Sequence, residues 1–385
     1  MMAVRMRPYQ RCTVTVMDTT DPEVDFDDQG VSSYVRHFDE VYAPILVPAQ
    51  AGERLAELEA LVEQIKADGQ GKPYDCIMGV SGGVDSTYVA VQAVRLGLRP
   101  LAVHFDSGWN SELAVDNIHN LVTKLGLDLY TQVVDWREMR DLQLAYLKSG
   151  IANADTPTDQ AFGIVAYQQA RKYGIRHIIS GSNYVSESIL PDSWEYTPDD
   201  AKLLRAIHRR FGKVSLKTYP VMGSAARTLW YPFVRGIKTH ALLNFLPYHY
   251  AEVKASIADE IGWRDYGGKH YESVFTRWFQ GYYLPKRFGF DKRIAHYSSL
   301  ILAREMTRDE ALALLDTTNY PAELQAQDHE FIAKKLGISV AELDTIVASP
   351  GKHYTDYPNS EAAVRRLYAF TAWVGGVLRK MRLLR

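Results

Sequence analysis

The sequence has few cysteines, almost no net charge and no long hydrophobic run, and each of these absences excludes a class of protein. Only Cys12 and Cys76 occur among 385 residues, which argues against a disulfide framework and suits a reducing cytoplasm. The net charge of −2 provides no basic surface for nucleic acid. No run reaches the roughly 18 apolar residues of a membrane helix, and residues 1–8 lack the apolar core of a signal peptide. We therefore expect a cytoplasmic protein that binds neither nucleic acid nor a membrane.

The remaining composition is that of an ordinary globular protein, with 46% hydrophobic and 23% charged residues. Short apolar runs alternate with amphipathic segments in its middle part. We expect strands at 76–80, 101–105, 127–134, 177–180 and 229–233, and helices at 111–125, 136–148, 158–173 and 251–261. Such alternation predicts an α/β fold, a parallel twisted sheet with helices on both faces.

The flanking regions lack this alternation. Residues 1 to about 50 look irregular, with a short strand at 11–18, and a helix is expected at 53–67. A helix with proline at its first position is expected to begin within 197–200. After about residue 265 the pattern becomes helical. The sequence thus predicts three regions, namely an N-terminal segment (1–70), an α/β domain (71–265) and a helical C-terminal domain (266–385).

The most informative stretch runs from Asp75 to Thr87. An apolar strand breaks at Ser81-Gly82-Gly83, and a helical pattern begins at Val84. Two glycines let consecutive backbone amides face a ligand, and a helix N-terminus adds partial positive charge. This arrangement predicts a phosphate-binding loop. It lacks the Gly-Lys-Ser/Thr ending of the Walker loop and does not fit the dinucleotide pattern GxGxxG.

The loop resembles the Ser-Gly-Gly-x-Asp-Ser signature of the PP-loop ATP pyrophosphatase superfamily, whose enzymes cleave ATP to AMP and pyrophosphate while adenylating a substrate. The resemblance implies an ATP site, whereas the alternative is a glycine-rich turn without a ligand. The residues expected to bind ATP are Ser81, Gly82, Gly83, Asp85, Ser86, Asp106 and Gly181.

Two carboxylates are candidates for binding Mg²⁺. Asp85 would repel a bound triphosphate unless a cation intervened, and Mg²⁺ is typically held by one or two carboxylates plus phosphate oxygens. The segment Gly181 to Glu187 follows a predicted strand and resembles a loop of NAD synthetase in which the glutamate helps to hold magnesium. That resemblance assigns the second carboxylate to Glu187 and catalytic positions to Ser182 and Asn183. The alternative is an N-cap serine followed by a solvated glutamate.

Two further aspartates are expected near the same edge of the sheet. Asp106 ends the second strand, where PP-loop enzymes bind adenosine, although it would serve equally as a loop cap. Asp159 lies at the start of a helix and could face the same edge, but capping by Thr158 explains that segment almost as well.

The stretch 267–299 mixes basic and aromatic side chains. They could bind phosphate and stack on a base or sugar, or they could form two helices with an aromatic core and solvated lysines. The candidate substrate-binding residues are Lys269, His270, Arg277, Lys286, Lys292 and Arg293.

Four stretches together resemble the N-acetyl sugar amidotransferases of bacterial surface-polysaccharide (LPS O-antigen) biosynthesis: 11–18, 79–86, 179–187 and 268–311. The resemblance implies ATP- and Mg²⁺-dependent conversion of the acetamido group of a nucleotide-linked sugar into an acetamidino group. It also implies ammonia from a separate class I glutaminase, which is often accompanied by a cyclase-like partner. The alternatives are a tRNA-modifying PP-loop enzyme, which adenylates a base before lysine or sulfur is added and usually needs a cysteine pair for thiolation, and a non-catalytic ATP-binding subunit.

The N-terminal segment departs from that family, in which two cysteine pairs are suited to a zinc site. Three of the four expected ligands are replaced here, by Thr15, Ser32 and Val35, and only Cys12 remains. We therefore expect no structural zinc, and a degenerate hairpin held instead by packing of Val14, Val16, Val31 and Val35.

Overall fold

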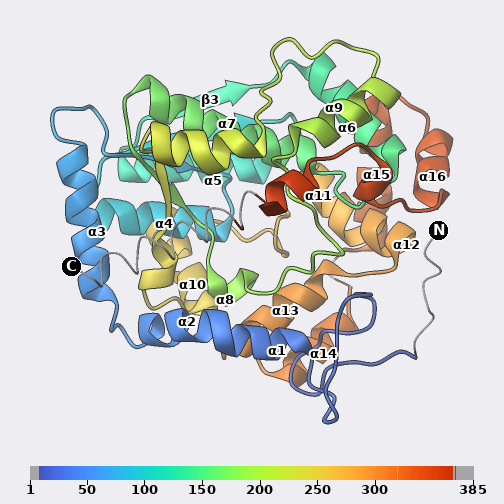
Figure 1. The fold of residues 1–385 in the computed structure, drawn as a ribbon, viewed down its shortest axis with the longest axis horizontal. Coiled ribbons are helices and arrows are strands. Elements are labelled where there is room, and N and C mark those ends of the chain that lie inside the picture. Colours follow the sequence, from blue (N-terminus) through green and yellow to red (C-terminus); the bar gives the residue numbers. More distant parts are fainter. Residues whose placement is uncertain (1–7, 319, 367–368, 370–385) are drawn as a thin grey trace.

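The computed structural model describes residues 8–318, 320–366 and 369, and a sheet of five parallel strands lies at its centre (Figure 1). The strands are β1 (Cys76–Gly79), β2 (Pro100–Asp106), β3 (Leu129–Val133), β4 (His177–Ser180) and β5 (Lys238–Ala241). Their order is β3-β2-β1-β4-β5, so the chain leaves β1 toward one edge and later continues from β1 toward the other. The predicted α/β fold class is confirmed. Residues 1–7, which bear on the signal peptide, and residues 370–385 of the expected C-terminal domain lie outside this description.

Helices cover both faces of the sheet because neighbouring strand residues point to opposite sides. Ile77 packs into one hydrophobic cluster, while Cys76 and Met78 pack into another. The helices of the first cluster are α6 (Trp136–Ser149), α7 (Thr156–Lys172) and α9 (Ala201–Phe211); those of the second are α3 (Leu55–Asp68), α4 (Val84–Arg95), α5 (Glu112–Leu125) and α10 (Tyr250–Ile261). Among the described residues, no helix combines the length and apolar character that crossing a membrane requires.

Two predictions about the later part of this domain were wrong. Residues 229–233 do not form the last strand; they lie in a π-helical segment, Ala226–Val234, where Phe233 is 72% exposed. The last strand, β5, lies at the sheet edge with the sequence Lys-Thr-His-Ala, and edge strands need no apolar run. Helix α9 begins at Ala201 with Asp200 as its N-cap, so Pro198 precedes the helix instead of opening it.

The N-terminal segment is more helical than expected. Helix α1 (Ser33–His37), a π-helical turn (Phe38–Tyr42) and α2 (Ala43–Gln50) follow one another without a break. Figure 1 shows them along one side of the molecule, next to α13 (Lys292–Leu302) and α14 (Arg308–Leu315). The expected strand at 11–18 is a loop closed by a single antiparallel bridge between Arg11 and Asp18. Its residues turn back too quickly to pair along a strand.

The loop at the degenerate cysteine positions is held by hydrogen bonds to sulfur. Cys12 Sγ accepts hydrogen bonds from the backbone N–H groups of Thr15 and Ser32, each at 3.3 Å, and all three residues are buried. Burial opposes the thiolate, but the hydrogen bonds from Ser32 and Thr15 outweigh it and lower the pKa of Cys12. The expected valine core is wrong in part, because Val16 is buried whereas Val14 is 40% exposed.

We expect purified protein to contain no stoichiometric zinc. One thiol, two hydroxyl-bearing residues and Val35 do not supply the thiolate or imidazole ligands of a structural zinc site. Elemental analysis after a chelator wash measures this directly, and near-stoichiometric zinc would contradict the prediction.

The C-terminal helices pack against both the sheet domain and the N-terminal loop. They are α11 (Val274–Trp278), a π-helical turn (Phe279–Tyr283), α12 (Leu284–Phe288), α13, α14, α15 (Ala322–Leu336) and α16 (Val340–Ala348). Thr307 and Glu310 form the expected capping box of α14. Arg308, in the first turn of α14, donates hydrogen bonds to the carbonyls of Cys12 and Thr15, and Ser298 Oγ of α13 accepts one from the N–H of Val16. These contacts fix the C-terminal helices beside α8 (Tyr184–Glu187), against which α13 packs.

Candidate active site

The glycine loop after β1 has the geometry of a ligand-facing turn. Gly82 has a φ of +83°, which favours glycine, and its carbonyl accepts hydrogen bonds from Trp263 Nε1 (2.8 Å) and Tyr266 OH (2.9 Å). The Ser86 hydroxyl donates to the carbonyl of Gly83 at 3.1 Å. Trp263 and Tyr266 thus fix the loop through the carbonyl of Gly82, and the N-terminus of α4 directly follows it.

The loop after β4 meets the glycine loop. A Cβ at Gly181 would lie 3.0 Å from the backbone carbon of Asp85 and from the backbone nitrogen of Ser86, so a side chain there would collide with the start of α4. Asn183 is buried and caps α8, because its Oδ1 accepts a hydrogen bond from the N–H of Ser186 at 2.9 Å. Ser182 Oγ lies 2.9 Å from Ser180 Oγ. Asn183 therefore shapes the loop that carries Glu187.

Asp85 and Glu187, the two predicted metal ligands, act on each other electrostatically across this junction. The proximity of Glu187 raises the pKa of Asp85, although burial is the larger cause of that rise. Burial disfavours the charged form of Glu187, but Lys269, His270 and a hydrogen bond from the backbone of Asn183 together outweigh it and hold the pKa of Glu187 below its usual value. Lys269 Nζ lies 3.0 Å from Glu187 Oε1 and donates to Ser186 Oγ at 2.9 Å. A cation from the C-terminal region thus offsets two carboxylates at the strand ends.

Two further side chains complete the surroundings of the glycine loop. Tyr248 OH donates a hydrogen bond to Asp85 Oδ1. The carboxylate of Glu272 faces Gly83, where an added Cβ would lie 3.3 Å from Glu272 Oε1. Neither residue was predicted from the sequence, because both lie more than 160 positions from the loop and no local motif marks them.

The two carboxylates of Asp85 and Glu187 suit Mg²⁺, which needs few protein ligands, better than they suit a metal ion whose ligands all come from the protein. Asp85 and Glu187 supply two carboxylates beside the glycine loop predicted to bind phosphate, and Mg²⁺ commonly takes its remaining ligands from water and phosphate oxygens. Within the described residues, no three acidic, histidine or cysteine side chains gather into a metal-binding cluster. These two residues are therefore the candidates for holding Mg²⁺ together with a nucleotide.

The other predicted substrate residues divide into two groups. Lys269, His270 and Lys292 belong to the site. His270 Nδ1 lies 3.7 Å from Glu272 Oε1, and its positive φ of 62° is uncommon outside glycine. Lys292 forms an ion pair with Glu195, while its ammonium group also interacts with Glu187.

Arg277 and Arg293 have structural partners instead. Arg277 forms two hydrogen bonds to the buried carboxylate of Asp328, at 2.7 and 2.8 Å. Arg293 pairs with Asp291 at 2.8 Å and donates to the carbonyls of Leu314 and Thr317 at the end of α14. Lys286 is exposed on α12. The structure thus gives Arg277 and Arg293 partners within the protein and leaves Lys286 exposed, while their expected substrate role stays a prediction.

We expect Arg277→Ala to lower the free energy of unfolding by about 3–5 kcal/mol, because it removes the cationic partner of the buried Asp328 carboxylate and leaves it the hydrogen bond from Tyr320 OH. Urea unfolding measures this, and Lys286→Ala, on the exposed face of α12, should change stability by no more than about 0.5 kcal/mol. Wild-type stability combined with lost substrate affinity in Arg277→Ala would restore the binding role.

Asp106 fits the capping alternative. Its Oδ1 accepts a hydrogen bond from the N–H of Gly108 at 2.8 Å, which closes the turn after β2. It still lies at the carboxyl end of a strand next to β1, so its carboxylate stays on the ligand side of the sheet. A nucleoside contact by Asp106 remains a proposal.

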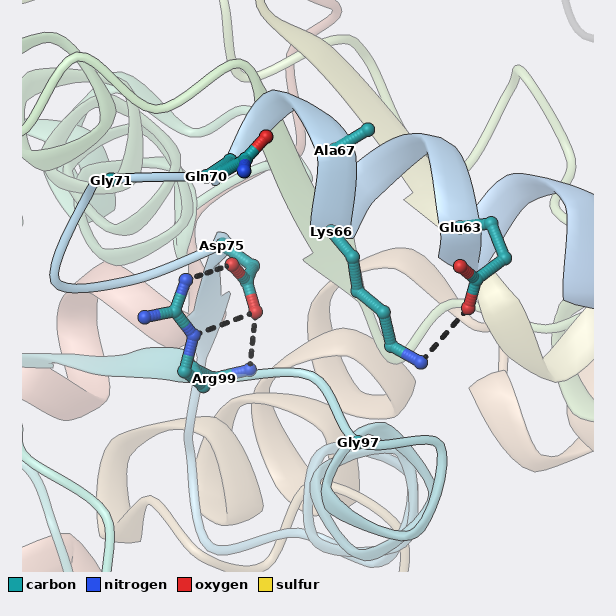
Figure 2. Close-up of a pocket in the computed structure, with 8 residues that line it drawn as sticks. All are labelled: Glu63, Lys66, Ala67, Gln70, Gly71, Asp75, Gly97 and Arg99. Atoms are coloured by element: carbon teal, nitrogen blue, oxygen red, sulfur yellow. Dashed lines mark hydrogen bonds and ion pairs between the residues drawn. The ribbon is translucent and has the colours of Figure 1, made fainter.

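A different pocket, of about 460 Å³, lies at the amino ends of the strands, opposite the candidate site (Figure 2). Asp75 and Arg99, which precede β1 and β2, pair across it at 2.6 Å, and Lys66 pairs with Glu63 at 3.0 Å. Ligands of parallel sheets bind at the carboxyl ends of strands, so this pocket lies away from the candidate site.

Residues 272–371 match the family model described as "LPS biosynthesis protein WbpG-like, C-terminal domain". The C-terminal region matches the WbpG-like family. This finding agrees with the resemblance predicted from 268–311. The matched region contains Lys292 and directly follows Lys269 and His270, which reach the candidate site.

Two similar solved structures are synthetases. The NH3-dependent NAD synthetase from Campylobacter jejuni subsp. jejuni NCTC 11168, in complex with the nitrate ion, is 15% identical, with a TM-score of 0.28; the alignment covers 35% of this chain and 57% of that one. The NMN synthetase from Francisella tularensis is 16% identical, with a TM-score of 0.27, over 52% of this chain and 95% of that one. The comparison with curated proteins gives no match.

Proposed function

We propose that the protein is an ATP-dependent amidotransferase that adenylates the acetamido oxygen of a nucleotide-linked N-acetyl sugar and replaces AMP with ammonia. The product would be an acetamidino sugar for LPS O-antigen biosynthesis. The observation that carries the proposal is the meeting of Asp85, Glu187 and Lys269. Lys269, from the region next to the WbpG-like match, pairs with Glu187, and both interact electrostatically with Asp85 in the glycine loop, which supports the proposal.

The chemistry needs no covalent intermediate with the protein. An amide carbonyl is a poor electrophile, so its oxygen first attacks the α-phosphorus of ATP, pyrophosphate leaves with the amide proton, and an O-adenylyl imidate forms. Ammonia then adds to the imidate carbon, and the carbon–oxygen bond breaks with its electron pair on AMP. The chain has to align the reactants and exclude water.

Each part of the site has a role in this scheme. The amides of Gly82 and Gly83 and the hydroxyls of Ser81 and Ser86 would hold the phosphates. Asp85 and Glu187 would hold Mg²⁺, which supplies positive charge against the departing pyrophosphate. Lys269 would supply a second positive charge from the other side.

The buried thiol counts against the tRNA-modifying alternative. Cys76 is the only cysteine of the α/β domain; it is fully buried in β1, and burial raises its pKa well above the usual value. A sulfur-transferring cysteine must be accessible and readily ionised. Pyrophosphate exchange into ATP separates the candidates, because the amidotransferase requires a nucleotide sugar for exchange, a tRNA-modifying enzyme requires RNA, and a binding subunit shows no exchange.

We further expect free ammonium to support turnover by the isolated chain, and glutamine to support it only with an added glutaminase. Neither cysteine is placed to act as a glutaminase nucleophile, since both are buried. Product formation with each nitrogen source measures this. Equal rates with glutamine and ammonium in the absence of a partner would contradict the prediction.

A further inference from the structure

A second cavity has no role in the scheme above. It measures about 300 Å³, and more than half of its lining residues, Arg287 and Tyr354 among them, belong to the region that matches the WbpG-like family. Asn153, on its wall, precedes α7. A short turn joins the end of α7 to the amino end of β4, and α7 packs along the sheet, so its first turn lies near the carboxyl ends of the strands. The cavity is therefore at the same end of the strands as the candidate site.

One helical turn of α13 links the cavity to the loop that carries Glu187. Glu195 lines the cavity and forms an ion pair with Lys292, the first residue of α13. His296 lies four residues further on the same face, about 6 Å along the helix axis. Its Nδ1 is 3.1 Å from the carbonyl oxygen of Ser186. The cavity and the predicted metal site are thus neighbours along α13.

The cavity contains two cations whose charges the protein does not neutralise. Neither Arg287 nor Lys352 forms an ion pair within the part of the chain that the structure describes. Arg287 donates hydrogen bonds to two backbone carbonyls, each at 3.2 Å, which fix the guanidinium group but leave its charge in place. Of the two carboxylates on the wall, Glu195 is paired with Lys292, and Asp192 is exposed. Two unpaired cations in one cavity suit a ligand with more than one negative charge, such as a diphosphate.

A group of closely packed rings lies beside these cations. The ring of Tyr354 stacks on that of Tyr196, with centroids 3.9 Å apart and planes inclined by 14°, and the ring centroid of His353 is 4.2 Å from that of Tyr354. Asn153 Nδ2 donates a hydrogen bond to the carbonyl of Tyr196 at 3.1 Å. Tyr354, His353 and Asn153 all line the cavity. Aromatic rings stack on bases, and an asparagine amide can bind the polar edge of a base. The cavity thus offers a surface for a nucleobase next to its cations.

We propose that this cavity binds the nucleoside diphosphate part of the sugar nucleotide, an inference that rests on the proposed function and says where that substrate is anchored. Arg287 and Lys352 hold the diphosphate, and the rings of His353 and Tyr354 lie beside the base. The sugar extends along α13 toward Glu187, where its acetamido group meets ATP. Contacts to the distant nucleotide supply binding energy that aligns the reacting amide.

The test measures UDP binding by calorimetry in the presence of saturating ATP and Mg²⁺, without a sugar. We expect UDP to bind one-to-one, because the glycine loop and the cavity are separate sites. Lys352→Glu should weaken UDP binding by about 10-fold or more, the usual value of one charge-assisted contact, and Lys352→Gln should weaken it less, while ATP affinity stays unchanged. In steady-state kinetics the KM for the UDP-linked sugar should rise by the same factor at nearly constant kcat, because the contact is equal in the ground and transition states.

Lys352 is exposed, so these substitutions should leave the fold intact, which urea unfolding verifies. The matched control is Lys124→Glu, which reverses the charge of an exposed lysine on α5 and should leave UDP and ATP binding unchanged. Displacement of UDP by ATP, or equal UDP affinity in Lys352→Glu and wild type, would overturn the inference. UDP binding that depends on Lys352, without sugar-dependent pyrophosphate exchange in the wild type, would instead overturn the proposed function.

Discussion

Asp85→Asn is expected to lower turnover by about 10²-fold or more, the scale seen when a group that stabilises transition-state charge is removed. The amide keeps the shape of the side chain and still accepts the hydrogen bond from Tyr248 OH, but it has no charge with which to hold Mg²⁺. ATP affinity should change much less, because the phosphate contacts come from the glycine loop. Steady-state kinetics at saturating Mg²⁺, with nucleotide binding measured separately, checks both statements.

The same substitution should not weaken the fold. Burial raises the pKa of Asp85, so the ionised form is disfavoured in the folded protein, and a neutral amide removes that penalty. The free energy of unfolding should therefore stay equal or rise. The control is Asp116→Asn on α5, which removes the exposed ion-pair partner of Arg264 and should leave turnover unchanged. Near-normal turnover of Asp85→Asn at saturating Mg²⁺ would exclude the metal-binding role.

Lys269→Met is expected to have a similarly large effect on turnover, about 10²-fold or more, and the opposite effect on stability. Its ammonium group helps to hold the pKa of Glu187 below the usual value, which means that it stabilises the ionised carboxylate in the folded state. Without the ammonium group of Lys269, the negative charges of Asp85 and Glu187 are less well neutralised, so the free energy of unfolding should fall. Pyrophosphate exchange and urea unfolding measure the two effects on one sample.

Two further variants make the Lys269 result specific. Lys269→Arg retains the charge and should recover part of the turnover, although a planar guanidinium does not reproduce the position of a compact ammonium. Lys66→Met removes a lysine that pairs with Glu63 at the opposite edge of the sheet and should leave turnover unchanged. Full activity in Lys269→Met would show that this cation only stabilises the fold.

The parts of the fold that could be predicted from the sequence are those in which local chemistry determines the structure. Strands β1, β2 and β4 are short apolar runs because they are buried on both faces, and the Ser81-Gly82-Gly83 turn is marked by residues that few other conformations need. Strand β5 lies at an edge, where burial no longer selects apolar residues, and periodicity could not identify it. Periodicity was equally misleading for the apolar run ending at Val234, which resembles a strand in sequence but lies in the π-helical segment Ala226–Val234.

The candidate site was predictable on one side only. The glycine loop and the segment ending at Glu187 carry local signatures, whereas Tyr248 and Glu272 reach the loop through contacts over long sequence separations. The sequence also could not separate structural from substrate-binding basic residues. An arginine that binds a carboxylate inside the protein looks the same in sequence as one that binds phosphate. Arg277 has Asp328 as its partner, and only the folded arrangement distinguishes it from Lys269.

The central claim is tested most directly by incubating the protein with ATP, Mg²⁺, isotopically labelled ammonium and candidate UDP-linked N-acetyl sugars, and analysing the sugar nucleotide by mass spectrometry. We expect a product in which an acetamido oxygen is replaced by a labelled NH group, formed together with equal amounts of AMP and pyrophosphate. Cleavage of ATP to ADP and phosphate, or formation of AMP and pyrophosphate without incorporation of label into any sugar, would contradict it.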